Sequence, residues 1–164
     1  AALQQRLGDR PVALGMRYGQ PSLASALERL LERGVERVLA VPLYPQYASS
    51  STGSSVERLY RLASERWNTP WIEVLPPFFD APEFLDAAAE LARPVLARLE
   101  PDHVLLSYHG LPERHIRKSD PSGSHCLASA GCCDQPCAAN RWCYRAQCFA
   151  TSRGLAARLG LPEE

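Results

Sequence analysis

Short apolar segments alternate along this chain with amphipathic ones, and this alternation restricts its fold more than any other feature. Four apolar segments have the length and composition of buried strands. They lie at residues 11–16, 37–41, 71–75 and 103–108. Strands that alternate with helices at this spacing predict an α/β fold with a parallel β-sheet flanked by helices.

The helices are expected where apolar residues recur three and four positions apart. They cover residues 22–33, 54–66, 80–99 and 151–159. Gly34 and Gly160 follow the first and the last of them, as glycines at helix ends commonly do. Asp80, with Glu83 three positions later, predicts an N-terminal cap for the third helix, and Pro94 predicts a kink or an early break inside it.

The charged residues are balanced, since 18 Lys and Arg side chains stand against 18 Asp and Glu side chains for a net charge of zero. This balance argues against a nucleic-acid partner and against an acidic disordered tail. The longest uncharged stretch, residues 38–56, contains prolines and many Ser and Thr residues, so it is too polar for a transmembrane helix. We therefore expect a cytoplasmic protein, or one that attaches peripherally to a membrane.

Three of the expected strands are followed by polar and aromatic residues. Arg17 and Tyr18 follow the first strand, Tyr44 and a Ser/Thr-rich turn follow the second, and His109 follows the fourth. Because ligands bind beyond the carboxyl ends of parallel strands, these side chains are expected to line one cleft. Aromatic faces with one basic group suit a flat apolar ligand with acidic groups, and the histidine suits a proton acceptor or a metal ligand. A structural role for His109, such as capping a helix, is the alternative.

All six cysteines of the chain lie between Cys126 and Cys148, in an irregular region over residues 119–148 that is rich in Gly, Ser and Pro. A plain connection in a compact domain is seldom this long, so the region is expected to be functional. Its spacing lacks the CxxC motifs of zinc sites and of thioredoxin-like proteins. The remaining kind of metal site is an iron–sulfur centre, which needs four thiolates. One of the adjacent Cys132 and Cys133 would then not be a ligand. Six reduced or disulfide-paired cysteines in a surface loop are the alternative.

Three longer stretches resemble ferrochelatases, the enzymes that insert ferrous iron into a porphyrin to form haem. They are MRYGQPS at residues 16–22, PLYPQYASSSTGSS at residues 42–55 and LSYHGLPERHIRKSDP at residues 106–121. The resemblance implies that residues 1–100 form part of a first chelatase-like, Rossmann-like lobe and that residues 101–164 begin a second lobe. It covers only the middle of a typical family member, which implies a fragment that is inactive by itself.

The resemblance also assigns roles to single residues. His109 matches the family's active-site histidine, which acts as an iron ligand or as the base that removes pyrrole protons. Arg17, Tyr18, Tyr44 and Ser50 match positions that line the porphyrin cleft. The acidic residue that the family places opposite the histidine has no counterpart in these 164 residues.

Some ferrochelatases also carry a [2Fe–2S] cluster, and the cysteine-rich region resembles the bacterial type whose ligands lie in an internal segment. The resemblance implies four ligands, with Cys132 able to replace Cys133 and with Cys137 left over. The four are Cys126, Cys133, Cys143 and Cys148. Since iron insertion involves no redox change, the cluster would be structural or regulatory.

The expected partners are ferrous iron, as the substrate metal, and a porphyrin, with protoporphyrin IX as our prediction and coproporphyrin as the alternative. The resemblance also allows a homodimer and peripheral contact with the inner membrane. Two other functions stay open at this point: an iron–sulfur or redox-sensing module without catalysis, and a zinc-stabilised α/β domain. The iron–sulfur or redox-sensing module would account for the cysteines but not for the residues at the strand ends. The zinc-stabilised domain would account for fewer of these features.

Overall fold

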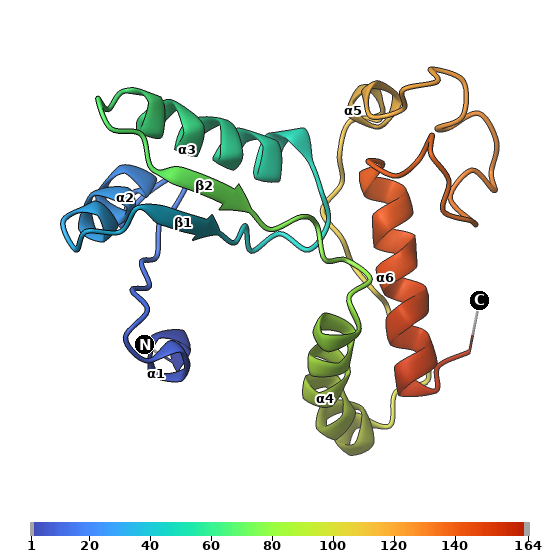
Figure 1. The fold of residues 1–164 in the computed structure, drawn as a ribbon. Helices are drawn as coiled ribbons and strands as arrows, with labels where there is room; N and C mark the ends of the chain where they lie inside the picture. The colour runs from blue at the N-terminus through green and yellow to red at the C-terminus, as the bar shows by residue number, and fades with distance from the viewer. Residues whose placement is uncertain (1, 163–164) are drawn as a thin grey trace. The chain divides into compact units, whose positions relative to one another are not determined.

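A computed structural model describes residues 2–162 of the chain, which fold into two compact units (Figure 1). The first unit comprises the chain up to residue 43 together with residues 49–76, and the second comprises residues 44–48 and the chain from residue 77 onward. The first unit contains α1 (Ala2–Leu7), α2 (Leu23–Leu31), β1 (Arg37–Ala40), the π-helical turn η1 (Ser49–Gly53), α3 (Ser54–Ser64) and β2 (Trp71–Val74). The second contains α4 (Pro82–Leu99), α5 (Glu113–Lys118) and α6 (Tyr144–Leu159).

The first unit is built on a parallel sheet of two strands. β1 pairs with β2 in a register that places Val38 beside Ile72. Successive side chains of a strand point to opposite faces, so Val38 and Ala40 share one face of β1. α2 and α3 pack on this face and bury an apolar core with it, formed by Leu27, Val38, Leu59, Leu62 and Ala63. A parallel sheet with helices packed on it confirms the predicted α/β class.

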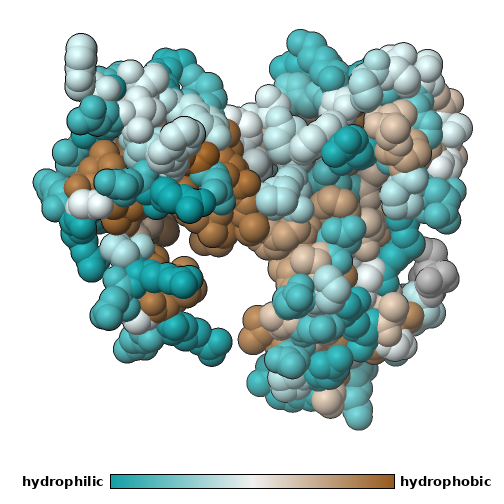
Figure 2. Space-filling model, in the orientation of Figure 1, coloured by the Kyte–Doolittle hydropathy of each residue, from teal (hydrophilic) through white to brown (hydrophobic). Residues whose placement is uncertain are grey.

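The opposite face of this sheet carries exposed side chains. Leu39 is 61% exposed and Trp71 is 77% exposed, and Figure 2 shows a hydrophobic area over the two strands. On the same face, the Arg37 guanidinium and the Glu73 carboxylate form an ion pair at 2.9 Å. The sheet is thus covered on one side by its own helices and left accessible on the other within its unit.

Both helices predicted for this part of the chain are confirmed. Ser22 caps α2, since its hydroxyl oxygen accepts a hydrogen bond from the backbone N–H of Ser25 at 3.1 Å. Gly34 follows the helix with a φ of +74°, a conformation that is open to glycine at little cost. α3 begins at Ser54, where the apolar periodicity predicts a start, and ends at Ser64.

Residues 11–16, which are predicted to form a strand, do not form one. The segment is extended, and an isolated bridge joins Met16 to Ser22. Gly15 lies so close to α2 that an added Cβ would stand 3.0 Å from the Ala26 Cβ. The segment therefore approaches α2 at Gly15, while Val12, Leu14 and Met16 stay exposed, and its backbone is not paired with β1.

The fourth predicted strand, residues 103–108, is likewise absent. Its apolar side chains are not enclosed, since Leu105 is 91% exposed, and within residues 2–162 the only sheet consists of β1 and β2. A strand exists where its backbone N–H and C=O groups find a neighbouring strand, so an apolar run alone does not form one. Of the three strands whose ends are predicted to meet at one sheet edge, only β1 is formed within residues 2–162, so the argument from adjacent strand ends is wrong.

α4 differs from the predicted helix at its N-terminus and at Pro94. It begins at Pro82 after Ala81 and without a side-chain cap, because proline at the first helical position already has a suitable φ and lacks the N–H that would need a partner. Asp80 is therefore not its cap. Pro94 does not break the helix, which continues to Leu99. Proline removes one backbone hydrogen bond, and packing of α4 against α6 offsets this loss. At this contact, Arg93 Nη2 also donates a hydrogen bond to the Arg158 carbonyl at 3.2 Å.

The second unit is organised by α4 and α6, which lie side by side in Figure 1. At their contact, a Cβ added to Gly154 of α6 would stand 2.6 Å from Leu85 Cδ1 of α4. Leu85 is buried, and so is Ala89 one turn later. A glycine in the middle of α6 thus lets the two helices approach closely.

α6 ends before Gly160, as predicted, but it begins at Tyr144 rather than at Thr151. Apolar periodicity does not mark the additional turns, because the polar Gln147 is among their buried residues. The irregular cysteine-rich region therefore ends at Cys143. Within residues 2–162, no helix is both long and apolar enough to cross a membrane.

Candidate functional site

α6 binds the loop that follows β1. The buried Gln147 side chain accepts a hydrogen bond from the backbone N–H of Tyr47 at 2.6 Å. One turn later, the buried Thr151 hydroxyl accepts a hydrogen bond from Gln46 Nε2 at 2.8 Å and donates to the Phe79 carbonyl at 2.7 Å. These side chains fix the loop that carries Tyr44. Sequence reasoning missed them, because a buried Gln and Thr look like surface residues in a helical pattern.

The same helix binds the segment that carries His109. The Ser152 hydroxyl and the Tyr108 hydroxyl form a hydrogen bond at 3.1 Å. Tyr144, in the first turn of α6, is partly buried, and Cys148 one turn later is buried. Burial raises the pKa of Tyr144 to about 12 and the pKa of Cys148 to about 11. The segment is thus attached to α6 through the Tyr108 side chain, while the His109 side chain itself is exposed.

Tyr44 and His109 therefore belong to the same unit, and both of their chain segments form hydrogen bonds with α6. Tyr44 is exposed, as His109 is. The sequence predicts that these two residues are neighbours because the strands before them would end next to each other. In the structure, the common element is a helix whose first turns the sequence analysis does not identify.

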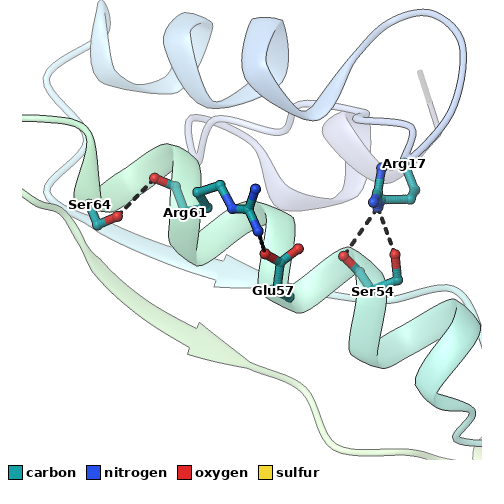
Figure 3. Close-up of polar contacts among 5 residues, drawn as sticks. All are labelled: Arg17, Ser54, Glu57, Arg61 and Ser64. Carbon is teal, nitrogen blue, oxygen red and sulfur yellow. Dashed lines mark hydrogen bonds and ion pairs between the residues drawn. The ribbon is translucent and has the colours of Figure 1, made fainter.

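The other three predicted porphyrin-site residues lie in the first unit. Arg17 Nε donates to the Ser54 carbonyl at 3.1 Å and to the Ser54 hydroxyl at 2.8 Å, which ties the loop of Arg17 to the first turn of α3 (Figure 3). The Arg17 guanidinium also lies over the Tyr18 ring, 4.6 Å from its centroid. Tyr18 is otherwise exposed, and so is Ser50 in η1. Farther along α3, Glu57 pairs with Arg61.

Five of the six cysteines are buried and one is exposed. Four of the buried ones form the core of the cysteine-rich region together with Ile116 of α5 and Ala146 of α6: Cys126, Cys132, Cys133 and Cys143. Cys148 is buried on α6. The exposed one is Cys137, whose sulfur lies 3.6 Å from His125 Nε2. Cysteine side chains thus supply much of the small hydrophobic core that this region has.

The acidity of these thiols is set by burial and by their mutual proximity. Burial raises the pKa of Cys126 to about 12, and the neighbouring Cys143 adds to the shift. Burial also raises the pKa of Cys133 to about 11. The pKa of Cys132 is lowered instead, because the backbone N–H of Leu127 donates to its sulfur at 3.4 Å. Neighbouring thiols in a buried site resist joint ionisation, so a metal would have to displace their protons.

Two further groups support the cysteines. Arg145 Nη1 lies 3.1 Å from the Cys133 sulfur, within hydrogen-bonding distance. The Asp120 carboxylate accepts hydrogen bonds from the backbone N–H groups of His125 at 2.7 Å and Cys126 at 2.9 Å. Hydrogen bonds from Ser122 and from these backbone groups hold the pKa of Asp120 well below its usual range. Asp120 therefore anchors the start of the cysteine core to the end of α5.

As the thiols stand, no three His, Cys, Asp or Glu side chains of residues 2–162 are arranged to hold a metal ion. The sulfurs of Cys132 and Cys133 lie 3.7 Å apart. The structure does not test which four of the cysteines would act as ligands.

Comparison with known proteins gives the family of this α/β chain. The family model for ferrochelatase matches residues 1–164, and the chain belongs to the ferrochelatase family. It is 50% identical to the ferrochelatase of Azotobacter vinelandii over 163 residues, which cover 99% of this chain and 48% of that protein. It is 47% identical to the ferrochelatase of Pseudomonas fluorescens (strain SBW25) over 93% of this chain and 45% of that protein. The chain thus spans about half the length of the curated relatives it matches.

Proposed function

We propose that the full-length protein inserts ferrous iron into a porphyrin, protoporphyrin IX, to form haem. Family membership supports the reaction, and one structural observation supports the site: the exposed His109 directly follows Tyr108, whose hydroxyl is hydrogen-bonded to Ser152 of α6. A catalytic side chain has to reach its substrate while its backbone stays fixed, and this arrangement provides both.

The proposed chemistry needs a proton acceptor. The porphyrin takes up Fe²⁺ and loses two pyrrole N–H protons, and an imidazole is well suited to accept a proton near neutral pH. His109 takes this role or guides the incoming metal. Tyr18 and Tyr44 offer exposed aromatic surface to the macrocycle, while Arg17 and Ser50 offer polar groups to its carboxylates.

Replacing His109 tests this assignment in the full-length protein. We expect His109→Ala to slow iron insertion about 10²–10⁴-fold, the usual contribution of an acid–base group, with porphyrin affinity nearly unchanged. His103→Ala is the matched control, because His103 is an exposed histidine of the same extended segment. Insertion rates and porphyrin fluorescence titrations decide the result. A His109→Ala variant that keeps more than a tenth of the rate contradicts the assignment.

Arg17 has a different expected role. If it pairs with a porphyrin propionate, Arg17→Ala weakens porphyrin affinity by about 1.5–3 kcal/mol, the range for a hydrogen bond between charged groups. The variant also loses the bonds to Ser54, so its thermal unfolding is measured beside the titration. Unchanged porphyrin affinity in a folded variant argues against the pairing.

We further propose that the cysteine-rich region holds a [2Fe–2S] cluster through Cys126, Cys133, Cys143 and Cys148. The region contains the type of ligand that such a cluster needs, since four cysteine side chains are buried in one core and Cys148 is buried as well. Arg145 also donates a hydrogen bond to the Cys133 sulfur, as groups around such clusters commonly do. Their present arrangement is not that of a metal site, so binding requires the thiols to draw together. When bound, the cluster would contribute stability or regulation.

Iron and acid-labile sulfide analysis of the purified full-length protein, with visible absorption, tests the cluster. We expect the absorption to be lost in Cys126→Ser and Cys143→Ser and retained in Cys137→Ser, since Cys137 is the exposed thiol. Stoichiometric zinc without sulfide would refute the cluster. Retention of the spectrum by Cys143→Ser would refute the ligand set.

The remaining parts of the proposal concern organisation and location. Residues 1–100 form part of a first lobe, and residues 101–164 begin a second lobe that includes the cysteine-rich insert at 119–148. We propose a cytoplasmic protein that can attach peripherally to the inner membrane, with a homodimer as the oligomeric state to be tested. Gel filtration with light scattering and fractionation of cells test the last two points.

A further inference from the structure

Two groups of its own unit hold the Arg17 side chain. Its Nε donates hydrogen bonds to the Ser54 carbonyl at 3.1 Å and to the Ser54 hydroxyl at 2.8 Å (Figure 3). One face of its guanidinium lies over the Tyr18 ring, 4.6 Å from the centroid. Arg17 and Ser54 are both half-buried, whereas Tyr18 is 72% exposed. The guanidinium is thus fixed at its Nε and on one face.

These contacts leave the outer edge of the guanidinium available. An arginine has five N–H donors, one on Nε and four on the two Nη atoms. Within residues 2–162, the hydrogen bonds of the Arg17 side chain involve Nε alone. The two Nη groups lie next to each other in one plane, and this geometry suits the two oxygens of a carboxylate.

The positive charge of Arg17 is not neutralised by an acidic neighbour. Among the described residues 2–162, no carboxylate forms an ion pair with it. Glu57, about one turn after Ser54 on α3, is paired with Arg61 instead (Figure 3). Because a half-buried charge favours a counter-charge, Arg17 is suited to bind an anionic group.

We propose that Ser54 is a positioning residue for Arg17: it occupies Nε and so directs both Nη groups to one carboxylate of the porphyrin. This inference rests on the proposed function, which assigns Arg17 to such a carboxylate. Ser54 does not touch the substrate. It determines which edge of the guanidinium the substrate meets.

α3 gives Ser54 a firm support. Ser54 is the first residue of this helix, and Leu59, Leu62 and Ala63 of the same helix are buried in the core of the unit. The carbonyl and the hydroxyl that bind Nε therefore have a fixed place. An arginine that is already held in its binding conformation loses less freedom when the ligand arrives, which raises affinity.

The first test is Ser54→Ala in the full-length protein, which removes the hydroxyl and keeps the carbonyl. We expect porphyrin affinity to fall about three- to tenfold, the effect of one hydrogen bond, with kcat for iron insertion unchanged. Ser54→Thr keeps a hydroxyl and is expected to bind porphyrin within about twofold of wild type. Ser64→Ala is the matched control, because Ser64 ends the same helix and its hydroxyl donates to the Arg61 carbonyl at 2.9 Å (Figure 3).

The second test uses the dimethyl ester of protoporphyrin IX, which has no carboxylate. A merely structural role of Ser54 would weaken the binding of the ester and of the free acid alike. We expect Ser54→Ala to weaken the binding of the free acid and to change that of the ester less than about twofold.

A third variant leaves Ser54 in place and tests the same geometry. Arg17→Lys keeps the positive charge but lacks the planar edge with two nitrogens, so its affinity for the free acid is expected to fall roughly tenfold. This measurement decides the matter even where Ser54→Ala folds poorly. Wild-type affinity in Arg17→Lys overturns the two-nitrogen contact and with it the role of Ser54.

The double variant Arg17→Ala/Ser54→Ala separates this inference from the function on which it rests. If Ser54 acts through Arg17, Ser54→Ala has no further effect on porphyrin affinity once Arg17 is absent. Additive losses, or equal losses for the free acid and the ester, overturn the role of Ser54. So does an unchanged affinity of Ser54→Ala beside a weakened Arg17→Ala, and this result leaves the carboxylate pairing intact. An unchanged affinity of Arg17→Ala overturns the pairing itself.

Discussion

Gly154 should resist replacement by alanine even though alanine is the better helix former. Gly154 lies inside α6, where the exchange contributes about 1 kcal/mol of helix propensity. Against this gain stands the contact with α4, because the new Cβ would lie 2.6 Å from Leu85 Cδ1. Leu85 is only 3% exposed, so its side chain has little room to move away.

The magnitude follows from these two opposing contributions. Overpacking a core by one carbon costs about 1–3 kcal/mol. Subtracting the helix-propensity gain leaves a net loss of about 0–2 kcal/mol in the free energy of unfolding. Leu85→Ala alone should cost about 2–5 kcal/mol, because it leaves a cavity. In the Leu85→Ala background the obstruction is gone, so Gly154→Ala should then stabilise by about 1 kcal/mol.

Urea unfolding of the wild-type protein, the two single variants and the double variant measures the four free energies. The double variant is the control, since it contains the same alanine without its obstacle. We expect a coupling energy of about 1–3 kcal/mol between the two positions, as contacting residues show. Stabilisation by Gly154→Ala in both backgrounds would refute the close helix contact.

Three further predictions use the same unfolding measurement. Thr151→Val should lower the free energy of unfolding by about 1–3 kcal/mol, because it leaves Gln46 Nε2 and the Phe79 carbonyl without their hydrogen-bond partner. An unchanged free energy of unfolding would mean that these two groups find other hydrogen-bond partners. The Asp120 carboxylate, whose pKa is lowered from 3.8, contributes stability that is present above that pH and is lost as the pH falls below it. Wild type should therefore lose more stability than Asp120→Asn when the pH is taken below about 4, and parallel acid curves would contradict this. Arg37→Ala should change the free energy of unfolding by less than about 1 kcal/mol, since its ion pair with Glu73 is exposed, and a larger loss would show that the pair is buried in the full-length protein.

The helices show what the sequence determines by itself. Ser22 and Gly34 bound α2, and Gly160 ends α6, where the sequence analysis expects them. These signals are local, because a cap or a left-handed glycine acts on backbone groups within one turn of it. The same holds for the apolar stripe of α3. The selection of the cysteines and of His109 as functional candidates also needs only the sequence, since it depends on residue type and spacing.

The tertiary structure alone decides which of these segments have partners. Residues 11–16 and 103–108 have the composition of strands, but composition does not record whether a neighbouring strand exists. Likewise, Gln147 and Thr151 carry no signal in a hydrophobic pattern, yet they bind the Tyr47 backbone and the Gln46 side chain. Hydrogen bonds between groups 100 and 105 residues apart depend on how helices and loops pack, which local periodicity does not encode. The sequence therefore determines which residues can do chemistry, and packing on α6 determines how their backbones are held.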